Sequence, residues 1–227
     1  MKTVNLFLCA MFVFAGLSCQ QEELLYSCNE KIDTWIKSNL SYVKSMDRAE
    51  WEGVDEELKR GCYAAFSPQQ KQQLWLGKFG EALSLDWSME EKEHIKVLID
   101  FVQTHLFYFD SAKEETDEEI ETIEVFAYEW IKKAESQLGW SRKLIGGLVA
   151  SPNSIIDKEG TLKLTHLNSD KRVKTRTETG VDCNCSTSSD WCSIDMMIEC
   201  LDVSCDVVPN DCGFLWLYDC DGRCNGI

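Results

Sequence analysis

Between residues 24 and 147, apolar residues recur with the 3.6-residue period of helices, and most of these apolar runs follow a helix-start signal. Four of the signals are capping boxes, in which a Ser, Thr or Asp side chain and a Glu or Gln three residues later cap the helix start reciprocally: Asp47–Glu50, Ser67–Gln70, Ser88–Glu91 and Thr116–Glu119. The pattern predicts a mainly α fold, with a single helical domain of about five helices over residues 19–150 that is large enough to bury one core.

The apolar stripes of these helices are the faces that we expect to be buried. They consist of Ile32, Trp35, Ile36, Leu40 and Val43; Trp51, Val54 and Leu58; Leu74, Trp75, Phe79 and Leu83; Ile95, Leu98, Ile99, Val102 and Leu106; and Ile120, Ile123, Phe126, Ala127, Trp130, Ala134 and Leu138. Their aromatic residues are interpreted as core, with an aromatic binding groove as the alternative. Gly139 is predicted to end the last helix. Gly146 and Gly147 are predicted to form a helix stop, although a double glycine is also the cleavage site of some peptide leaders.

Residues 1–18 are predicted to be a signal peptide. The apolar run from Leu6 to Leu17 is too short to span a bilayer stably but long enough for the core of such a peptide. Ser18 and Cys19 then resemble the lipobox of bacterial lipoproteins, which makes Cys19 the lipidation candidate; a plain secretory signal is the alternative. We therefore expect an exported protein, either an outer-membrane or cell-surface lipoprotein that contacts the membrane through a lipid on Cys19, or a periplasmic or secreted protein.

Residues 151–180 form a polar and basic connector in which the helical period fades. Alternating leucines around Thr161–Thr165 allow a short hairpin against the helices. The basic residues that follow are candidates for proteolytic processing: Lys171, Arg172, Lys174 and Arg176. A strand that offers these charges to the acidic helical domain is the alternative. We favour processing, because a cut here would free the segment that follows.

Eight of the twelve cysteines lie in residues 181–227, the segment that we call the cysteine module. They are Cys183, Cys185, Cys192, Cys200, Cys205, Cys212, Cys220 and Cys224. Such density in an exported chain predicts a small disulfide-rich unit with little regular structure, and zinc binding is the weaker alternative. Cys28 and Cys62 form either a further disulfide or a pair of buried thiols.

The most specific string in the chain is Cys-Asn-Cys-Ser-Thr-Ser-Ser-Asp-Trp-Cys, at residues 183–192. It resembles the start of fulvocin C, a small disulfide-bonded bacteriocin, and Gly213 and Trp216 before the last cysteine pair add to the likeness. The whole chain is similar to the fulvocin C-related bacterial proteins, which place such a module behind a signal segment and a helical region. This resemblance implies a bacteriocin-like role, but we infer no disulfide pairing from it.

Charge excludes two simple mechanisms. The net charge of −16 argues against nucleic-acid binding. The cysteine module alone carries nine acidic residues against Arg223, a net charge of −8, whereas a membrane-disrupting peptide is expected to be cationic. Its apolar run Gly213–Tyr218 is interpreted as the small core of the module, with an exposed receptor-binding patch as the alternative.

No residue pattern points to catalysis, a cofactor or a metal. His94 is expected to be solvated at a polar helix start and His105 to lie in or beside the core, while His166 belongs to no motif. We therefore expect that the protein is not an enzyme. The leading hypothesis is an exported bacteriocin-like protein whose module is a non-enzymatic toxin or interaction module, released by cleavage in the connector. The alternative is an uncleaved cell-surface lipoprotein that serves binding or adhesion. Either would act on an unknown protein or cell-envelope target.

Overall fold

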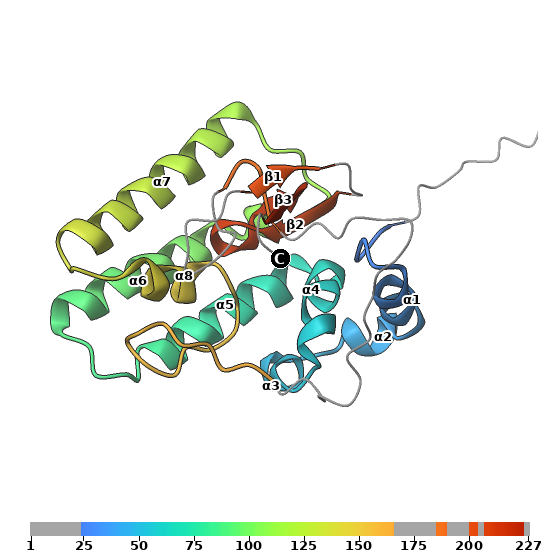
Figure 1. The fold of residues 1–227 in the computed structure, drawn as a ribbon, viewed down its shortest axis with the longest axis horizontal. Helices are drawn as coiled ribbons and strands as arrows, with labels where there is room; N and C mark the ends of the chain where they lie inside the picture. The colour runs from blue at the N-terminus through green and yellow to red at the C-terminus, as the bar shows by residue number, and fades with distance from the viewer. Residues whose placement is uncertain (1–23, 166–184, 190–199, 204–206, 225–227) are drawn as a thin grey trace, which may run out of the picture.

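The computed structural model of the protein describes residues 24–165, 185–189, 200–203 and 207–224. Over these residues the chain is mainly helical, with eight α-helices followed by a small strand region (Figure 1). The helices are α1 (Glu30–Ser38), α2 (Leu40–Val43), α3 (Arg48–Glu52), α4 (Glu56–Ala65), α5 (Pro68–Ala82), α6 (Met89–Thr104), α7 (Asp117–Ser136) and α8 (Arg142–Val149), with the 3-10 helices η1 (Leu106–Phe109) and η3 (Phe214–Trp216). None of the described helices is both long and apolar enough to cross a bilayer.

All four predicted capping boxes are present, at the starts of α3, α5, α6 and α7. At the first of them, the Asp47 carboxylate accepts a hydrogen bond from the Glu50 backbone N–H at 2.9 Å, and the Glu50 carboxylate accepts one from the Asp47 N–H at 3.0 Å. These bonds satisfy backbone donors that have no partner inside the helix, which explains why the helix starts could be read locally.

The number of helices was underestimated, because two predicted helices are each divided in two and α8 was not predicted. The first is interrupted at Asn39, whose side-chain amide donates to the Trp35 carbonyl at 2.8 Å in place of a continuing helix. The second ends at Gly53, so that α3 is short and α4 begins again at Glu56. Leu106 lies in η1 and not in α6. Gly139, with φ of +66°, follows α7 in the left-handed conformation, as predicted for a helix end.

The prediction of a helix stop at Gly146 and Gly147 is wrong, since both residues lie inside α8. Their role is close packing. A Cβ atom on Gly147 would lie 2.8 Å from the carbonyl oxygen of Gly160, so the missing side chain lets a tight turn of the connector approach the helix. Gly160 itself has a φ of +82°.

The aromatic residues of the helices form the core, as expected. Trp51, Trp75, Phe79 and Trp130 are buried, and Trp75 stacks on Phe79 with 5.8 Å between ring centroids. Ile120 is an exception to the predicted stripes, because 38% of it remains exposed.

The connector begins as a packed segment and not as a free linker. Residues 151–155 are buried, and Ile155 pairs with Leu162 in a single antiparallel bridge. The Ile156 N–H donates to the Thr161 carbonyl at 2.9 Å, which makes the predicted hairpin very short. Leu164 is exposed.

The described part of the cysteine module contains two small antiparallel ribbons. Strand β1 (Cys200–Asp202) pairs with β4 (Gly222–Cys224), and β2 (Val208–Cys212) pairs with β3 (Tyr218–Cys220). In Figure 1 these strands lie between α7 on one side and α4 on the other. The module contacts α4 through β2 and α8 through η3.

Candidate functional site

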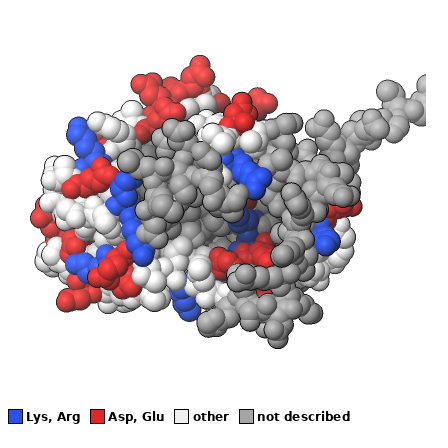
Figure 2. All heavy atoms as spheres, in the orientation of Figure 1, with Lys and Arg blue, Asp and Glu red and all other residues white. Residues whose placement is uncertain are grey.

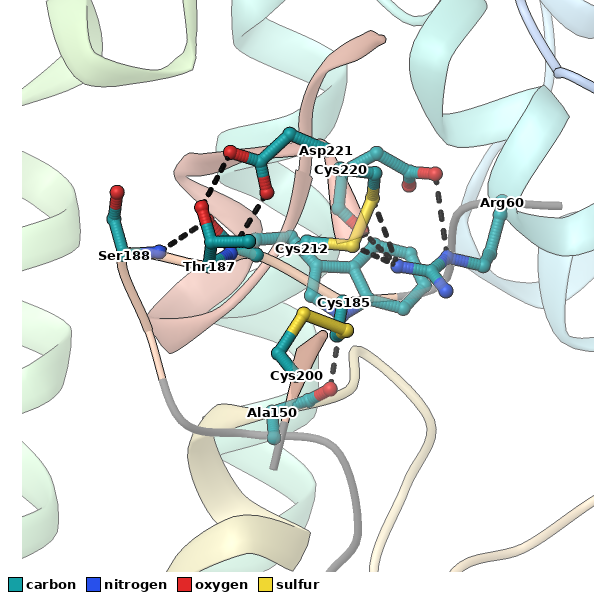
Figure 3. Close-up of a disulfide and its surroundings, with 12 residues drawn as sticks. Arg60, Ala150, Cys185, Thr187, Ser188, Cys200, Cys212, Cys220 and Asp221 are labelled. Carbon is teal, nitrogen blue, oxygen red and sulfur yellow. Dashed lines mark hydrogen bonds and ion pairs between the residues drawn. A yellow bond between two sulfur atoms is a disulfide. The ribbon is translucent and has the colours of Figure 1, made fainter. Parts of the chain in front are cut away.

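Two disulfides are described in the module, Cys185–Cys200 and Cys212–Cys220 (Figure 3). Cys224 is also disulfide-bonded. A sulfur in a disulfide is not a zinc ligand, so the zinc alternative fails for these cysteines. Several predicted site residues lie outside the described residues: Cys19, Lys171, Arg172, Lys174, Arg176, Cys183, Cys192 and Cys205.

Cys28 and Cys62 do not form a disulfide with each other. Cys62 is a fully buried thiol of α4, and its burial raises its pKa to about 12. A thiol with such a pKa stays protonated at neutral pH and is a poor nucleophile. Cys62 therefore contributes to packing and offers no reactive centre.

The apolar run of the module is buried, as predicted, but it packs against the helices as well as against β2 of the module. Phe214–Leu217 belong to the same core cluster as the helical aromatic residues. The Trp216 indole N–H donates to the carbonyl oxygen of Ala150 at 2.9 Å. The ring of Trp216 lies edge-on to that of Tyr63, with 4.9 Å between the ring centroids. The ring of Phe214 lies edge-on to that of Trp130, with 6.3 Å between the ring centroids. A module with so few apolar residues cannot enclose such side chains alone, so the helical core supplies the missing contacts.

Arg60 of α4 also binds the module, through Asp211 and the Cys212–Cys220 disulfide (Figure 3). Its Nε lies 3.2 Å from Oδ2 of Asp211, and its Nη2 donates to the Asp211 carbonyl oxygen at 2.5 Å. The same Nη2 lies 2.7 Å from Sγ of Cys212 and 3.2 Å from Sγ of Cys220. One guanidinium therefore bridges a helix, a strand and a disulfide. We call the contact of Phe214–Leu217 and Asp211 with the helices the junction.

Three lysines of α4 and α5 are fully buried, and each places its ammonium over an aromatic ring. The distances from Nζ to the ring centroid are 4.8 Å for Lys59 over Trp51, 5.0 Å for Lys71 over Tyr63 and 5.1 Å for Lys78 over Trp75. Burial lowers the pKa of Lys71 to about 8, against the opposing negative charges of Asp211 and Asp110. Sequence reasoning missed these lysines. The only hint was that Lys71 and Lys78 are seven residues apart, on the helical face of Leu74 and Trp75.

A cavity of about 640 Å³ opens between the start of α7 and the module. We call it the acidic cavity, because five carboxylates line it: Glu114, Glu115, Glu124, Asp219 and Asp221. Among the described residues, Lys113 is the only basic residue in its lining, and its ammonium binds Glu119 at 2.5 Å. Figure 2 shows further acidic side chains over the N-terminal end of α7, at the top of the view.

The carboxylates of the acidic cavity repel one another. Burial, followed by the charges of Glu119 and Asp219, raises the pKa of Glu115. Burial raises the pKa of Tyr218 to about 12, and Glu124 and Glu115 add to that shift. The carboxylates of this cavity therefore act on one another's titration and on that of Tyr218.

The prediction of a solvated His94 is wrong. Its ring is buried and stacks on Trp130 with 4.6 Å between centroids, and its Nε2 lies 3.0 Å from the Trp130 carbonyl oxygen. Among the described residues, its Nδ1 has no hydrogen-bond partner. His105 stacks on Phe101 at 4.5 Å, at the edge of the core as expected, and His166 lies outside the described residues.

Acid is expected to destabilise the protein through His94. Burial lowers the pKa of His94 from 6.5 to about 4, so the folded protein binds this proton less readily than the unfolded chain. Stability is then lost as the pH falls from 6.5 through 4, by up to about 3 kcal/mol. Urea unfolding of the wild type and of His94→Gln at pH 7.0 and 4.5 measures this loss as the difference between the two chains. An equal loss in both would refute the assignment.

The chain matches no protein-family model, no curated protein and no solved structure. The resemblance of the cysteine module to fulvocin C therefore stays a prediction from residues 183–227. The junction and the acidic cavity are the features on which a function can be argued.

Proposed function

We propose that this protein is an exported, non-enzymatic interaction protein that acts with its cysteine module in place and binds a positively charged segment of a protein partner in the acidic cavity. The observation that carries the proposal is the composition of this cavity. Glu115 and Glu124 come from the helical region, and Asp219 and Asp221 from the module. A binding site built from both parts requires that they stay together.

The lining suits lysine and arginine side chains. Carboxylates attract their charged heads, while Ile120, Ile123 and Leu217 offer apolar surface to their aliphatic stems. The ring of Tyr218 adds a face for a cation. A cavity of this size holds a small ligand or a few side chains, which fits a short basic stretch of a polypeptide. The partial exposure of Ile120 is then explained by its place in the binding wall.

Export is supported by the two described disulfides, which form and persist in oxidising compartments. The signal peptide over residues 1–18 and lipidation of Cys19 remain predictions, as does the surface location that they imply. The absence of an enzymatic role is also part of the proposal. The two described histidines pack against aromatic rings, and the described Cys62 is an inert thiol.

Release of the module as a toxin is the other hypothesis, and the junction weighs against it. Cleavage near Lys171 and Arg172 would leave the contacts of Trp216 and Arg60 intact, because those contacts are not covalent. A cut chain would then stay associated. The bacteriocin-like role suggested by the sequence stays a prediction, which inhibition of neighbouring cells by the purified protein would test.

Binding of a basic peptide tests the proposal directly. A fluorescently labelled hexapeptide of alternating Lys and Arg is titrated with the oxidised mature protein, and its anisotropy is followed. Replacing three cavity carboxylates (Glu114→Gln, Glu115→Gln and Glu124→Gln) is expected to weaken binding about tenfold, since each surface charge contributes about 0.5 kcal/mol.

The matched control changes the net charge equally on exposed surfaces that do not line the cavity, with Glu90→Gln, Glu129→Gln and Glu135→Gln. We expect less than a twofold effect from this control. An equal loss of affinity in both triple variants would mean that the peptide follows the net charge only. No binding by the wild type at low salt would refute the proposal.

A further inference from the structure

Asp211 is a buried carboxylate with only part of its hydrogen bonding satisfied. It lies on β2 at the junction and is 4% exposed. Its Oδ2 pairs with Nε of Arg60 at 3.2 Å, whereas its Oδ1 has no hydrogen-bond donor among the described residues. A carboxylate accepts several hydrogen bonds in water, and its transfer into a protein is costly when they are not replaced.

The charged groups around Asp211 come from three helical elements. Arg60 projects from α4, Lys71 projects from α5, and Asp110, directly after η1, acts on Lys71. The Nζ of Lys71 is also buried and has no hydrogen-bond partner among the described residues; it lies over the ring of Tyr63. Arg60 and Lys71 thus favour the ionised Asp211, but neither gives its Oδ1 a hydrogen bond.

Arg60 does not depend on the Asp211 carboxylate alone. It also donates to the backbone carbonyl oxygen of Asp211, and its guanidinium lies 5.3 Å from the centre of the Trp216 ring. These contacts persist when the carboxylate becomes neutral. Protonation therefore removes an incompletely compensated buried charge without releasing the arginine from the module.

We propose that Asp211 is a proton-controlled latch: the cysteine module docks more tightly on α4 and α5 when Asp211 is protonated, and more loosely when it is ionised. The latch would tune how often the junction opens locally, in an exported protein that meets changes of external pH. It goes beyond the proposed function, because it concerns docking of the module and not the ligand.

The pKa of Asp211 is shifted upward, which is the direction that the latch requires. Burial raises it from 3.8 to about 6, although Arg60 and Lys71 act to lower it. A pKa that is higher in the docked form means that docking favours the proton. The stabilisation is complete below pH 3.8 and is lost as the pH rises through 6. The contribution of Asp211 is then expected to make docking about tenfold tighter at pH 5.0 than at pH 7.5.

Hydrogen exchange measures this opening without any ligand. The oxidised wild-type protein is exchanged at pH 5.0 and 7.5, and the rates for peptides covering 208–220 are corrected for the intrinsic effect of pH. The readout is the ratio of opening at pH 7.5 to opening at pH 5.0. In Asp211→Asn, which keeps the shape and removes the ionisation, this ratio should be about tenfold smaller than in the wild type. His94 titrates in both chains, so its contribution to the ratio cancels between them.

A second variant keeps the test decisive if Asp211→Asn folds poorly. Lys71→Met removes the cation that lowers the pKa of Asp211, so the transition in opening should move to higher pH. An Asp211→Asn chain whose ratio of opening at the two pH values lies within twofold of the wild-type ratio would overturn the latch. Because the basic peptide is absent, this result is independent of whether the acidic cavity binds it.

Discussion

Replacing Trp216 by alanine is expected to lower the free energy of unfolding by about 3–5 kcal/mol, the range for a large buried aromatic residue. The variant loses the contact with Tyr63 and the hydrogen bond to Ala150, and it leaves a cavity between the module and the helices. Because Trp216 belongs to the common core, the loss should reach both parts. Chemical denaturation under oxidising conditions measures the change in free energy, and hydrogen exchange shows where protection is lost.

Leu201→Ala is the matched control within the module. Leu201 is 42% exposed, so its replacement should change stability by about 0.5 kcal/mol or less. For Trp216→Ala we expect faster exchange in α4 and α8 as well as in β2 and β3. If exchange accelerated in the module alone, the two parts would be energetically independent. A released module would then become the better hypothesis.

The starts of the helices could be predicted because their causes are local. Ser67 and Gln70, or Thr116 and Glu119, are three residues apart and satisfy each other's backbone donors in any chain that places them there. The interruption at Asn39 was harder to foresee, since an asparagine can either cap a helix or continue it. The aromatic core followed from periodicity alone, because its residues recur on one face of each helix.

The fate of the buried polar residues could not be read from the sequence. His94 follows a glutamate at a helix start, and its burial is explained by the packing of Trp130 from α7 and of Trp140 against its ring. Lys71 and Asp211 are far apart in sequence and meet only because the module docks on α5. Local patterns carry no information about such contacts, since they depend on tertiary packing.

The acidic cavity illustrates the same limit. Glu114 and Glu115 belong to an acidic run that by itself is typical of a solvated helix start, and Asp219 and Asp221 counted only toward the charge of the module. Each interpretation is reasonable alone. Docking brings the two groups to one cavity, where their repulsion becomes a property of the site. The charge balance of the chain argued only against nucleic-acid binding, and the fold is needed to bring these carboxylates to one place.

Gly160→Ala is expected to destabilise the protein by about 3 kcal/mol, through two separable causes. A Cβ atom would lie 2.5 Å from the Lys143 carbonyl oxygen and 2.6 Å from the Leu144 Cα, so the backbone of α8 would have to move. The φ of +82° adds about 1 kcal/mol for any residue with a side chain.

Two other glycines separate these causes. Gly139 has a φ of +66° and open space around it, so Gly139→Ala should cost about 1 kcal/mol. Gly80 lies in α5 with neither constraint, so Gly80→Ala should stabilise the protein by about 0.5–1 kcal/mol. Thermal and urea unfolding of the three variants would give this order if the connector packs on α8 as described. A cost at Gly160 no larger than that at Gly139 would show that the turn of the connector can leave α8 freely, and residues 151–165 would then be a linker after all.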